Sequence, residues 1–421
     1  MKTFAGDYAM EFNTKLLHGR SVTGYADNSI LPQIAQVTAF AYESAQAQEK
    51  VFAHQANGFA YTRIGNPTIA AFEQRMAELE GGMSAIACSS GMAAISMGLL
   101  NFLSAGDEII AASGLYGGTI DLFSDLEKLG IHVNYVEKLI PEEIHKYTNK
   151  HTKVIYGEFI SNPGLSVLDI PSLAEYAHSI GVPLVIDATT VTPYVANPIS
   201  LGADIVIHST SKYVNGSGNS ISGVIVDSGK FPWDFDKYPA LSDFRKYGKL
   251  CYSIRLRTDL WENFGGCLSP MNAYLNVLGL ETLGLRMERI NRNAKELAAA
   301  LAELEGVTVR HPSLPTHENA DLVQEELKGY GGGILTLRVG SKENAFSVIN
   351  SLKLATIASN IGDIRTLVLH PASTIFSKNG KEAREKAGVF DDTIRVSVGI
   401  EDAKDLIEDF TQAIEAVVNK K

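Results

Sequence analysis

Short apolar stretches alternate with amphipathic helical patterns over the middle of this 421-residue chain. Helical patterns over residues 119–129 and 170–180, for example, lie between stretches typical of buried strands. This alternation predicts an α/β architecture, with a mostly parallel sheet covered by helices on both faces. Ligands of such sheets bind at the carboxyl ends of the strands. The predicted strands cover residues 84–88, 108–112, 132–136, 153–160, 182–187, 203–208 and 221–226.

The patterns divide the chain into three parts. Residues 1–60 have weak periodicity and predict an N-terminal arm, and residues 61–257 predict a large domain built on the sheet. Residues 258–421 begin with a long helical connection, which ends near residue 305, and continue as a smaller α+β domain that closes with a helix over residues 403–418. The strands predicted for this smaller domain cover residues 333–339, 352–359, 366–370 and 393–398.

Composition and charge exclude several classes of protein. The net charge is -11 and the isoelectric point is near 5.5, so no nucleic-acid partner is predicted. No apolar run approaches the length of a membrane span, and the first residues lack the apolar core of a signal peptide. Cys88, Cys251 and Cys267 have no paired spacing, which argues against a disulfide framework or a metal site and fits a reducing cytoplasm.

Asp187 ends one predicted strand of the sheet, and Lys212 follows the next predicted strand. A lysine amine can form a Schiff base with the aldehyde of pyridoxal phosphate (PLP), and a carboxylate can pair with the protonated ring nitrogen of this cofactor. The hydroxyl groups of Ser209 and Ser211 lie in the same motif as the lysine and can hold the phosphate. A nicotinamide dinucleotide site is a weaker alternative, because no G-x-G-x-x-G motif with a following acidic residue comes after the first strand.

Two glycine-containing turns follow other predicted strands. Ser90, Gly91 and Met92 open a helix whose exposed N–H groups suit a phosphate, although a plain strand-to-helix turn explains the same pattern. Tyr116 precedes two glycines, which let the backbone approach so that an aromatic ring can lie flat against a planar cofactor. The alternative for this tyrosine is a core position in a glycine turn.

Three further motifs carry polar groups that suit an anionic ligand, and each also has a structural explanation. Asn162 follows a strand and can bind a phenolic oxygen of the cofactor or a substrate carboxylate, or can simply form a turn. Tyr61 and Arg63 share a face in extended backbone and can grip one anion, or can lie in a surface loop. Arg395 alternates with apolar residues in a predicted strand, so it needs an anionic partner when buried, either a substrate α-carboxylate or a structural salt bridge.

In this order the motifs resemble the Cys/Met-metabolism family of PLP-dependent enzymes. The resemblance runs from about residue 14 to the C-terminus, and it implies fold type I of the PLP-dependent transferases, which is the aspartate aminotransferase-like fold. It implies catalytic roles for Lys212, as the Schiff-base lysine, and for Tyr116, whose ring stacks on the cofactor and assists proton transfer. Asp187 is then the partner of the ring nitrogen.

The resemblance also implies roles for the remaining candidate residues. Tyr61 and Arg63 match a pair that reaches the phosphate from a neighbouring subunit, which implies a homo-oligomer and usually a dimer of dimers. Cofactor binding is implied for Ser90, Gly91, Met92, Asn162, Thr189, Ser209 and Ser211, and substrate binding for Asn162, Ser359, Asn360 and Arg395.

Within the family, several stretches are most similar to the O-acetylhomoserine sulfhydrylase branch, among them residues 116–119, 162–165 and 370–374. The implied reaction is a γ-replacement that converts O-acetylhomoserine and sulfide, or a small thiol, to homocysteine, or methionine, and acetate. Methionine γ-lyases, which usually carry a cysteine where this chain has Gly118, are an alternative. Cystathionine lyases or synthases and a non-catalytic protein with the PLP fold are others. The sequence leaves the acyl group and the thiol donor open.

Three stretches depart from the family pattern. Ala188 stands where the family usually has Asn, and Ile375-Phe376 stand where sulfhydrylases have Thr-His. Residues 215–219 replace the usual Gly-His-Gly. The last two departures lie near the expected substrate entrance, so they bear on the substrate more than on the cofactor.

Overall fold

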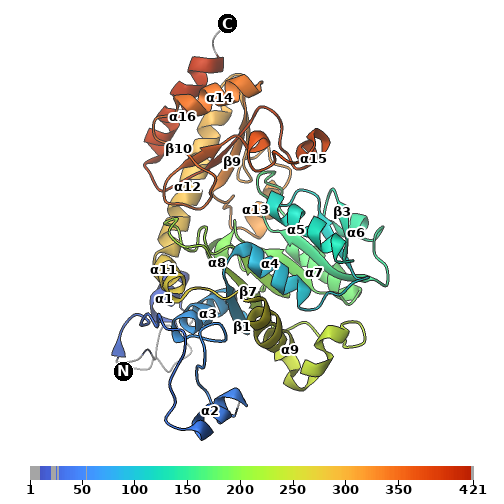
Figure 1. Cartoon of the computed structure of the whole chain (residues 1–421). Coiled ribbons are helices and arrows are strands. Elements are labelled where there is room, and N and C mark those ends of the chain that lie inside the picture. Colours follow the sequence, from blue (N-terminus) through green and yellow to red (C-terminus); the bar gives the residue numbers. More distant parts are fainter. Residues whose placement is uncertain (1–9, 20–24, 26–27, 54, 419–421) are drawn as a thin grey trace.

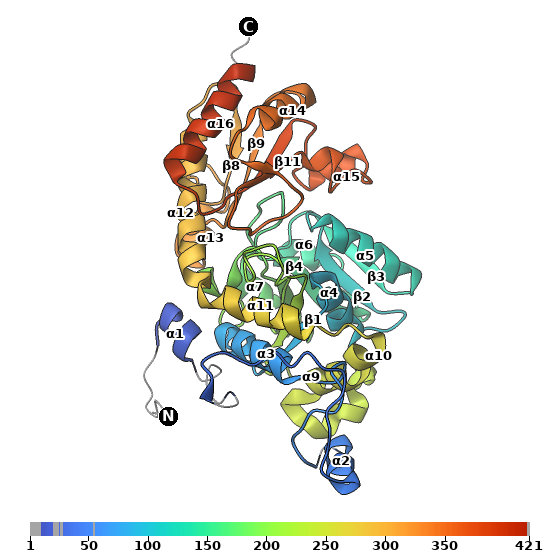
Figure 2. The ribbon, with the colours of Figure 1, turned by 60° about the vertical axis from the view of Figure 1, so that its left-hand side comes forward.

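The computed structural model describes residues 10–19, 25, 28–53 and 55–418. Within these residues two sheet-based units are joined by the long helix α12 (Leu283–Ala302), which runs from one unit into the other (Figure 1). Part of the predicted N-terminal arm, namely residues 1–9, 20–24, 26–27 and 54, lies outside the described residues. Its described part contains α1 (Phe12–His18) and α2 (Ala45–Phe52), and α2 projects away from the sheets in both views (Figure 2).

The larger unit contains a seven-stranded sheet with the strand order β1-β7-β6-β5-β4-β2-β3. The pairs β2–β3, β2–β4, β4–β5 and β5–β6 are parallel, whereas β7 is antiparallel to both β1 and β6. The predicted, mostly parallel α/β sheet is therefore confirmed. The strands are β1 (Ser84–Cys88), β2 (Glu108–Ala112), β3 (His132–Val136), β4 (Thr152–Glu158), β5 (Leu184–Asp187), β6 (Ile205–His208) and β7 (Gly223–Asp227).

Helices cover both faces of this sheet. Side chains alternate along each strand, so Leu184 and Ile186 of β5 pack into one apolar cluster and Val185 packs into the other. The first cluster includes residues of α3 (Pro67–Glu80), α7 (Ile170–Ser179), α8 (Thr192–Val195) and α11 (Pro270–Glu281), and the second includes residues of α4 (Gly91–Leu100), α5 (Gly117–Lys128) and α9 (Cys251–Arg255).

Local residues set the boundaries of α3. Its first turn is capped by Asn66, whose side-chain oxygen accepts a hydrogen bond of 2.9 Å from the N–H of Thr68, and Pro67 occupies the first helical position. Gly81 adopts a left-handed conformation with φ of 69° and ends the helix. The four apolar residues predicted to share one face are all buried, and they are Ile69, Phe72, Met76 and Leu79.

The smaller unit contains a five-stranded sheet with the order β10-β11-β12-β9-β8. The closing helix is found where it was predicted, whereas β10 covers only two residues of a longer predicted strand. The strands are β8 (Thr308–Arg310), β9 (Ile334–Arg338), β10 (Thr356–Ile357), β11 (Leu367–Leu369) and β12 (Thr393–Ser397). The helices are α13 (Ala320–Glu325), α14 (Lys342–Ser351), the 3-10 helix η5 (Pro371–Ser373), α15 (Lys381–Lys386) and α16 (Ala403–Val418).

The long helical connection predicted from residue 258 is interrupted. Gly265, with φ of 71°, ends a helical segment, and the chain becomes helical again only where Pro270 opens α11. The boundaries predicted at residues 60 and 257 remain predictions. The shorter helices of the larger unit are α6 (Pro141–Ile144), the 3-10 helix η3 (Pro239–Leu250), the π-helix η4 (Leu256–Trp261) and α10 (Glu262–Phe264).

Arg286 joins the segment that follows Lys212 to the connecting helix α12. Its buried guanidinium donates hydrogen bonds to the carbonyl oxygens of Tyr213 (2.6 Å), Val214 (3.1 Å) and Gly279 (2.6 Å). Gly216 has φ of 74°, and a Cβ atom there would lie 2.2 Å from the guanidinium. This position in the unusual segment 215–219 therefore requires glycine.

Among the helices that the structure describes, none is both long and apolar enough to cross a lipid bilayer. The described residues also contain no cluster of three or more His, Cys, Asp or Glu side chains suited to a metal ion. Cys88, Cys251 and Cys267 are free thiols, so no disulfide constrains the fold.

Candidate active site

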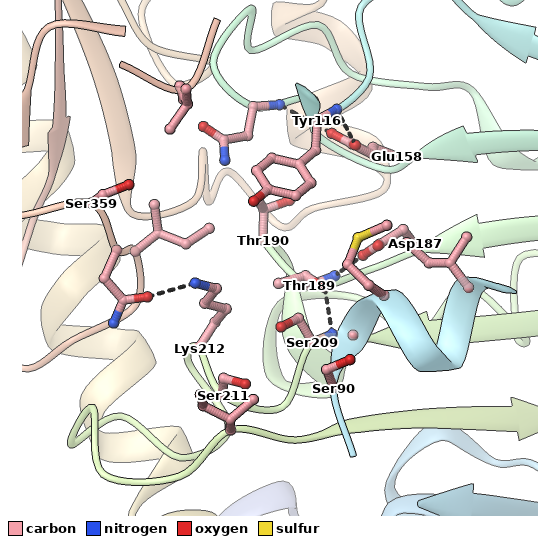
Figure 3. Close-up of a pocket in the computed structure, with 18 of the residues that line it drawn as sticks. Ser90, Tyr116, Glu158, Asp187, Thr189, Thr190, Ser209, Ser211, Lys212 and Ser359 are labelled. Carbon is pink, nitrogen blue, oxygen red and sulfur yellow. Dashed lines mark hydrogen bonds between the residues drawn. The ribbon is translucent and has the colours of Figure 1, made fainter. Parts of the chain in front are cut away.

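A cavity of about 420 Å³ lies at the carboxyl ends of β4, β5 and β6 (Figure 3). The N-termini of α4 and α5 contribute to its wall from the larger unit, and residues 359–361, β12 and Ile375 contribute from the smaller unit. The cavity brings together every predicted site residue except Tyr61 and Arg63. The predicted residues that line it are Ser90, Gly91, Met92, Tyr116, Asn162, Asp187, Thr189, Ser209, Ser211, Lys212, Ser359, Asn360 and Arg395.

Lys212 lies in the turn that follows β6, and its side chain points into the cavity (Figure 3). Its Nζ donates a hydrogen bond of 2.6 Å to Oδ1 of Asn360. Burial, together with the positive charge of Arg395, lowers the pKa of Lys212 from 10.5 to about 8. Much of the amine is therefore neutral near this pH, and only a neutral amine acts as a nucleophile or a base.

Asp187 is the last residue of β5. Its Oδ1 accepts a hydrogen bond of 2.9 Å from the N–H of Thr189, and Oγ1 of Thr189 accepts one of 2.8 Å from the N–H of Ser209. These bonds connect the turn after β5 to the turn after β6. Burial raises the pKa of Asp187, while the hydrogen bonds from Thr189 oppose this shift. A buried carboxylate here gains from a cationic partner such as a protonated ring nitrogen.

The N-terminus of α4 and the turn after β6 form a cradle for an anion. Ser90 caps the helix, because its Oγ accepts a hydrogen bond of 3.0 Å from the N–H of Ala93. A Cβ atom at Gly91 would lie 2.6 Å from Cβ of Ser209, so this glycine lets the two turns approach each other. The N–H groups of Gly91 and Met92 have no intrahelical acceptor at this end of the helix, which suits a phosphate.

The two serines of the lysine motif differ in their contacts. Oγ of Ser211 donates a hydrogen bond to the carbonyl oxygen of Ser222 (3.0 Å) and accepts one from the N–H of Ser222 (2.8 Å). Oγ of Ser209 forms no hydrogen bond with any other residue that the structure describes, and Ser209 lines the cavity. The Ser209 hydroxyl is therefore available to a phosphate, whereas the Ser211 hydroxyl holds its turn against the start of β7.

Tyr116 precedes α5, and its side chain lines the cavity with 40% of the residue exposed. The two glycines that follow it serve different contacts. A Cβ atom at Gly117 would lie 2.8 Å from the carbonyl oxygen of Ile375, so Gly117 allows the loop of the smaller unit to approach. A Cβ atom at Gly118 would lie 2.6 Å from Cε1 of Tyr116, so a larger residue there would displace the ring.

Arg395 of β12 is a second cation at the cavity, and it is only 3% exposed. Its Nη2 donates to the carbonyl oxygen of Asn360 (2.8 Å) and its Nη1 to Oδ1 of Asn162 (3.4 Å), while its buried Nε has no partner. Burial lowers the pKa of Arg395 to about 10. No carboxylate of the described residues forms an ion pair with Arg395, so the guanidinium suits a carboxylate that a substrate brings.

Several residues that were not predicted also line the cavity, among them Glu158, whose carboxyl group accepts hydrogen bonds from two backbone N–H groups. Glu158 ends β4 as Asp187 ends β5, but the predicted strand extended to residue 160 and placed Glu158 inside it, which concealed this similarity. Ile375 and Phe376, which depart from the family pattern, were expected near the substrate entrance. Ile375 lines the cavity, whereas Phe376 is buried in a small apolar cluster.

Tyr61 and Arg63 do not line the cavity of their own chain. Nη1 of Arg63 donates a hydrogen bond of 2.8 Å to the carbonyl oxygen of Glu262. The guanidinium of Arg63 lies 5.4 Å from the centre of the Tyr61 ring, and 38% of Tyr61 is exposed. The two side chains therefore pair with each other outside this cavity.

A family model described as Cys/Met metabolism PLP-dependent enzyme matches residues 13–415. The chain belongs to this family. It is 39% identical to an O-acetyl-L-homoserine sulfhydrylase of Corynebacterium glutamicum, over 96% of this chain and 97% of that protein. It is also 39% identical to a homocysteine synthase of Schizosaccharomyces pombe, over 96% of this chain and 98% of that protein. An L-methionine gamma-lyase of Fusobacterium nucleatum subsp. polymorphum is 35% identical, over 96% of this chain and 98% of that protein.

A solved structure agrees with the family. A Campylobacter jejuni protein assigned as an O-acetylhomoserine (thiol)-lyase superposes with a TM-score of 0.90 at 32% identity, over 96% of this chain and 100% of that chain. That structure contains N'-pyridoxyl-lysine-5'-monophosphate. The predicted fold type I is confirmed, and the chain described here is a PLP-dependent enzyme. Its residues fit the cofactor, because the cavity offers an amine, a buried carboxylate and an anion cradle.

The lowered pKa of Lys212 predicts how the apoenzyme takes up PLP. Only the neutral amine attacks the aldehyde, so below the pKa the rate constant of uptake should rise about tenfold per pH unit. Because the pKa is about 8, the rise should level off above that pH instead of continuing towards 10.5. The rate is measured over a pH series from the absorbance of the bound cofactor. A rate constant that still rises about tenfold between about pH 9 and about pH 10 would contradict the lowered pKa.

Proposed function

We propose that the protein catalyses a γ-replacement in which the acetate group of O-acetylhomoserine is replaced by sulfide or a small thiol. The products are homocysteine, or methionine when the thiol is methanethiol, and acetate. The contacts of Asn360 support this proposal most. Its Oδ1 accepts from Nζ of Lys212 at 2.6 Å, and its carbonyl oxygen accepts from Nη2 of Arg395 at 2.8 Å. Asn360 thus lies between the amine of Lys212 and the buried guanidinium of Arg395. This arrangement suits removal of a proton by Lys212 from a substrate whose carboxylate is bound by Arg395.

Arg395 and Asn162 bind the α-carboxylate of the substrate in this proposal. The Nε of Arg395 has no partner within the described residues, and its Nη1 contact to Asn162 is long at 3.4 Å. The guanidinium therefore has donors available for a bidentate carboxylate. A carboxylate held there directs the α-carbon of the substrate towards Lys212.

Bound PLP supplies a ring that withdraws electrons from the α-carbon of the amino acid. The carboxylate of Asp187 keeps the ring nitrogen protonated, and Ser209 and the N-terminus of α4 hold the phosphate. With its amine free, Lys212 removes the α-proton, and its pKa of about 8 keeps a neutral base available. A second proton leaves Cβ while acetate leaves Cγ. Sulfide then adds at Cγ, and Lys212 and Tyr116 return the protons.

A γ-lyase reaction on methionine or cystathionine uses the same groups and is the second candidate. Gly118 favours replacement, because γ-lyases usually carry a cysteine at this position. Any Cβ atom there would lie 2.6 Å from the Tyr116 ring in this chain. Elimination would release ammonia and a 2-oxo acid without a thiol, so the two reactions are separated by their products.

An assay with sulfide and O-acetylhomoserine tests the proposal. We expect homocysteine as the product, and a loss of about a thousandfold in kcat for Lys212→Ala because the general base is removed. Arg395→Met should raise KM for the amino acid roughly a hundredfold, because a buried partner of the carboxylate is lost. The product is identified by mass spectrometry.

Arg292→Met is the matched control, since Arg292 is exposed on α12 outside the cavity, and its KM should equal that of the wild type. Offering O-succinylhomoserine and O-acetylserine in parallel identifies the acyl group and the chain length that the enzyme accepts. Release of ammonia and a 2-oxo acid from methionine at a higher rate than homocysteine formation would contradict γ-replacement.

We also propose that a second copy of the chain completes the site and that the protein is a homo-oligomer. Tyr61 and Arg63 lie outside their own cavity, as expected of a pair that serves a neighbouring subunit. The N-terminal segment exposes apolar side chains that would be costly on a monomer, with Ile30 85%, Val37 48% and Phe52 57% exposed. A dimer, with a dimer of dimers as the next level of assembly, would cover part of this surface.

Light scattering and cofactor titration test this assembly together. The mass in solution should be at least twice that of the chain, and Arg63→Ala should weaken PLP binding roughly tenfold through the loss of a charged hydrogen bond. Lys50→Ala, a change in the same N-terminal segment, should leave PLP affinity unchanged. A monomeric protein with wild-type PLP affinity for Arg63→Ala would contradict the proposal.

A further inference from the structure

Glu158 is the last residue of β4, and its partner across the parallel ladder is Asp187, the last residue of β5. Residues paired in this way direct their side chains to the same face of a sheet. Both carboxyl groups line the cavity, and Glu158 is only 7% exposed (Figure 3). The carboxyl end of the sheet therefore carries two acidic groups side by side, of which only one faces a cofactor nitrogen in the proposed function.

The carboxyl group of Glu158 bridges two turns of the backbone. Its Oε1 accepts a hydrogen bond of 2.6 Å from the N–H of Tyr116, the residue that precedes α5. Its Oε2 accepts one of 3.2 Å from the N–H of Asn162, in the turn after β4. One side chain thus sets the separation between the backbone that carries the Tyr116 ring and the backbone that carries the Asn162 amide.

The positions of these two turns determine where the Tyr116 ring and the Asn162 amide lie. The Tyr116 residue is partly exposed, and the backbone of Gly117 and Gly118 lies close to the Ile375 carbonyl and to the Tyr116 ring. The Asn162 amide contacts the guanidinium of Arg395. A shift of either backbone would therefore move a group that faces the cofactor ring or the substrate carboxylate.

The two backbone hydrogen bonds of Glu158 favour its ionised form, whereas its burial and the neighbouring Asp187 oppose ionisation. Burial and the neighbouring Asp187 raise the pKa of Glu158 to about 8. Two adjacent buried carboxyl groups ionise together only at a cost, so the two groups lose their protons in separate steps. Burial raises the pKa of Asp187 as well, and the hydrogen bonds from Thr189 offset part of this shift. The other charged or titratable groups that face the pair are Tyr156 of β4, Tyr116, Lys212 and Arg395.

We propose that Glu158 is a positioning residue, whose carboxyl group holds the Tyr116 ring and the Asn162 amide in the geometry that substrate binding requires. The role in turnover rests on the proposed function, whereas the effect on amino-acid binding does not. Glu158 acts through the two backbone N–H groups and forms no bond to the reacting atoms.

Glu158→Gln tests this proposal in the holoenzyme. Glutamine keeps the size and one acceptor oxygen but presents an NH2 group to the second backbone N–H, so one hydrogen bond is lost. We expect the circular dichroism of the bound cofactor to change and the Kd of L-norleucine, which has no leaving group, to rise roughly tenfold in a titration of cofactor absorbance. KM for O-acetylhomoserine should rise by a similar factor, while the PLP content and Tm stay close to wild type.

Glu326→Gln is the matched control. Glu326 is a partly buried carboxyl group outside the cavity, and burial raises its pKa to about 7. This variant should bind L-norleucine like the wild type. Glu158→Ala removes both hydrogen bonds and should raise the Kd of L-norleucine further. If this variant does not fold, Glu158→Gln alone still tests the positioning role.

A cofactor signal and a norleucine Kd that both equal the wild-type values in Glu158→Gln would overturn the proposal. The proposed function can fail separately. If the wild type forms no homocysteine but Glu158→Gln still weakens norleucine binding, then the γ-replacement is wrong and the positioning role of Glu158 is supported.

Discussion

The parallel pairing of β4, β5 and β6 is the constraint on which the site depends. In this register Glu158 lies opposite Asp187 and Asp187 lies opposite Ile207, so the three strands end at one edge of the sheet. The turns that follow these strands carry Asn162 and Lys212 into one cavity. A slip of one residue in β5 would turn Asp187 to the opposite face of the sheet, because side chains alternate along a strand.

The cavity gathers charged groups that form no ion pairs with other described residues. Burial raises the pKa values of Asp187 and Glu158 and lowers those of Lys212 and Arg395, so each group is shifted towards its neutral form. A buried charge is costly unless it is paired. A protonated ring nitrogen, a phosphate and an α-carboxylate supply complementary charges. This requirement explains why one cavity suits both PLP and an amino acid.

Much of this arrangement could be predicted from the sequence, because local patterns determine the strands and the turns that carry Lys212 and Asp187. The role of Glu158 could not be predicted, since it depends on the register between β4 and β5 and on turns that are distant in the chain. The hydrogen bond from Ser211 to Ser222 could not be predicted either, because it depends on the antiparallel pairing of β7 with β6. The helical pattern from residue 258 concealed the break at Gly265, because apolar periodicity continues on both sides of it.

In the proposed function, Lys212 is the lysine that binds the cofactor opposite Asp187. Reduction of the holoenzyme with borohydride, followed by proteolysis and mass spectrometry, locates the attached pyridoxyl phosphate directly. We expect the added mass on the peptide that contains Lys212 and on no other peptide. An adduct on a different lysine, or a reduced protein that carries no adduct, would contradict it.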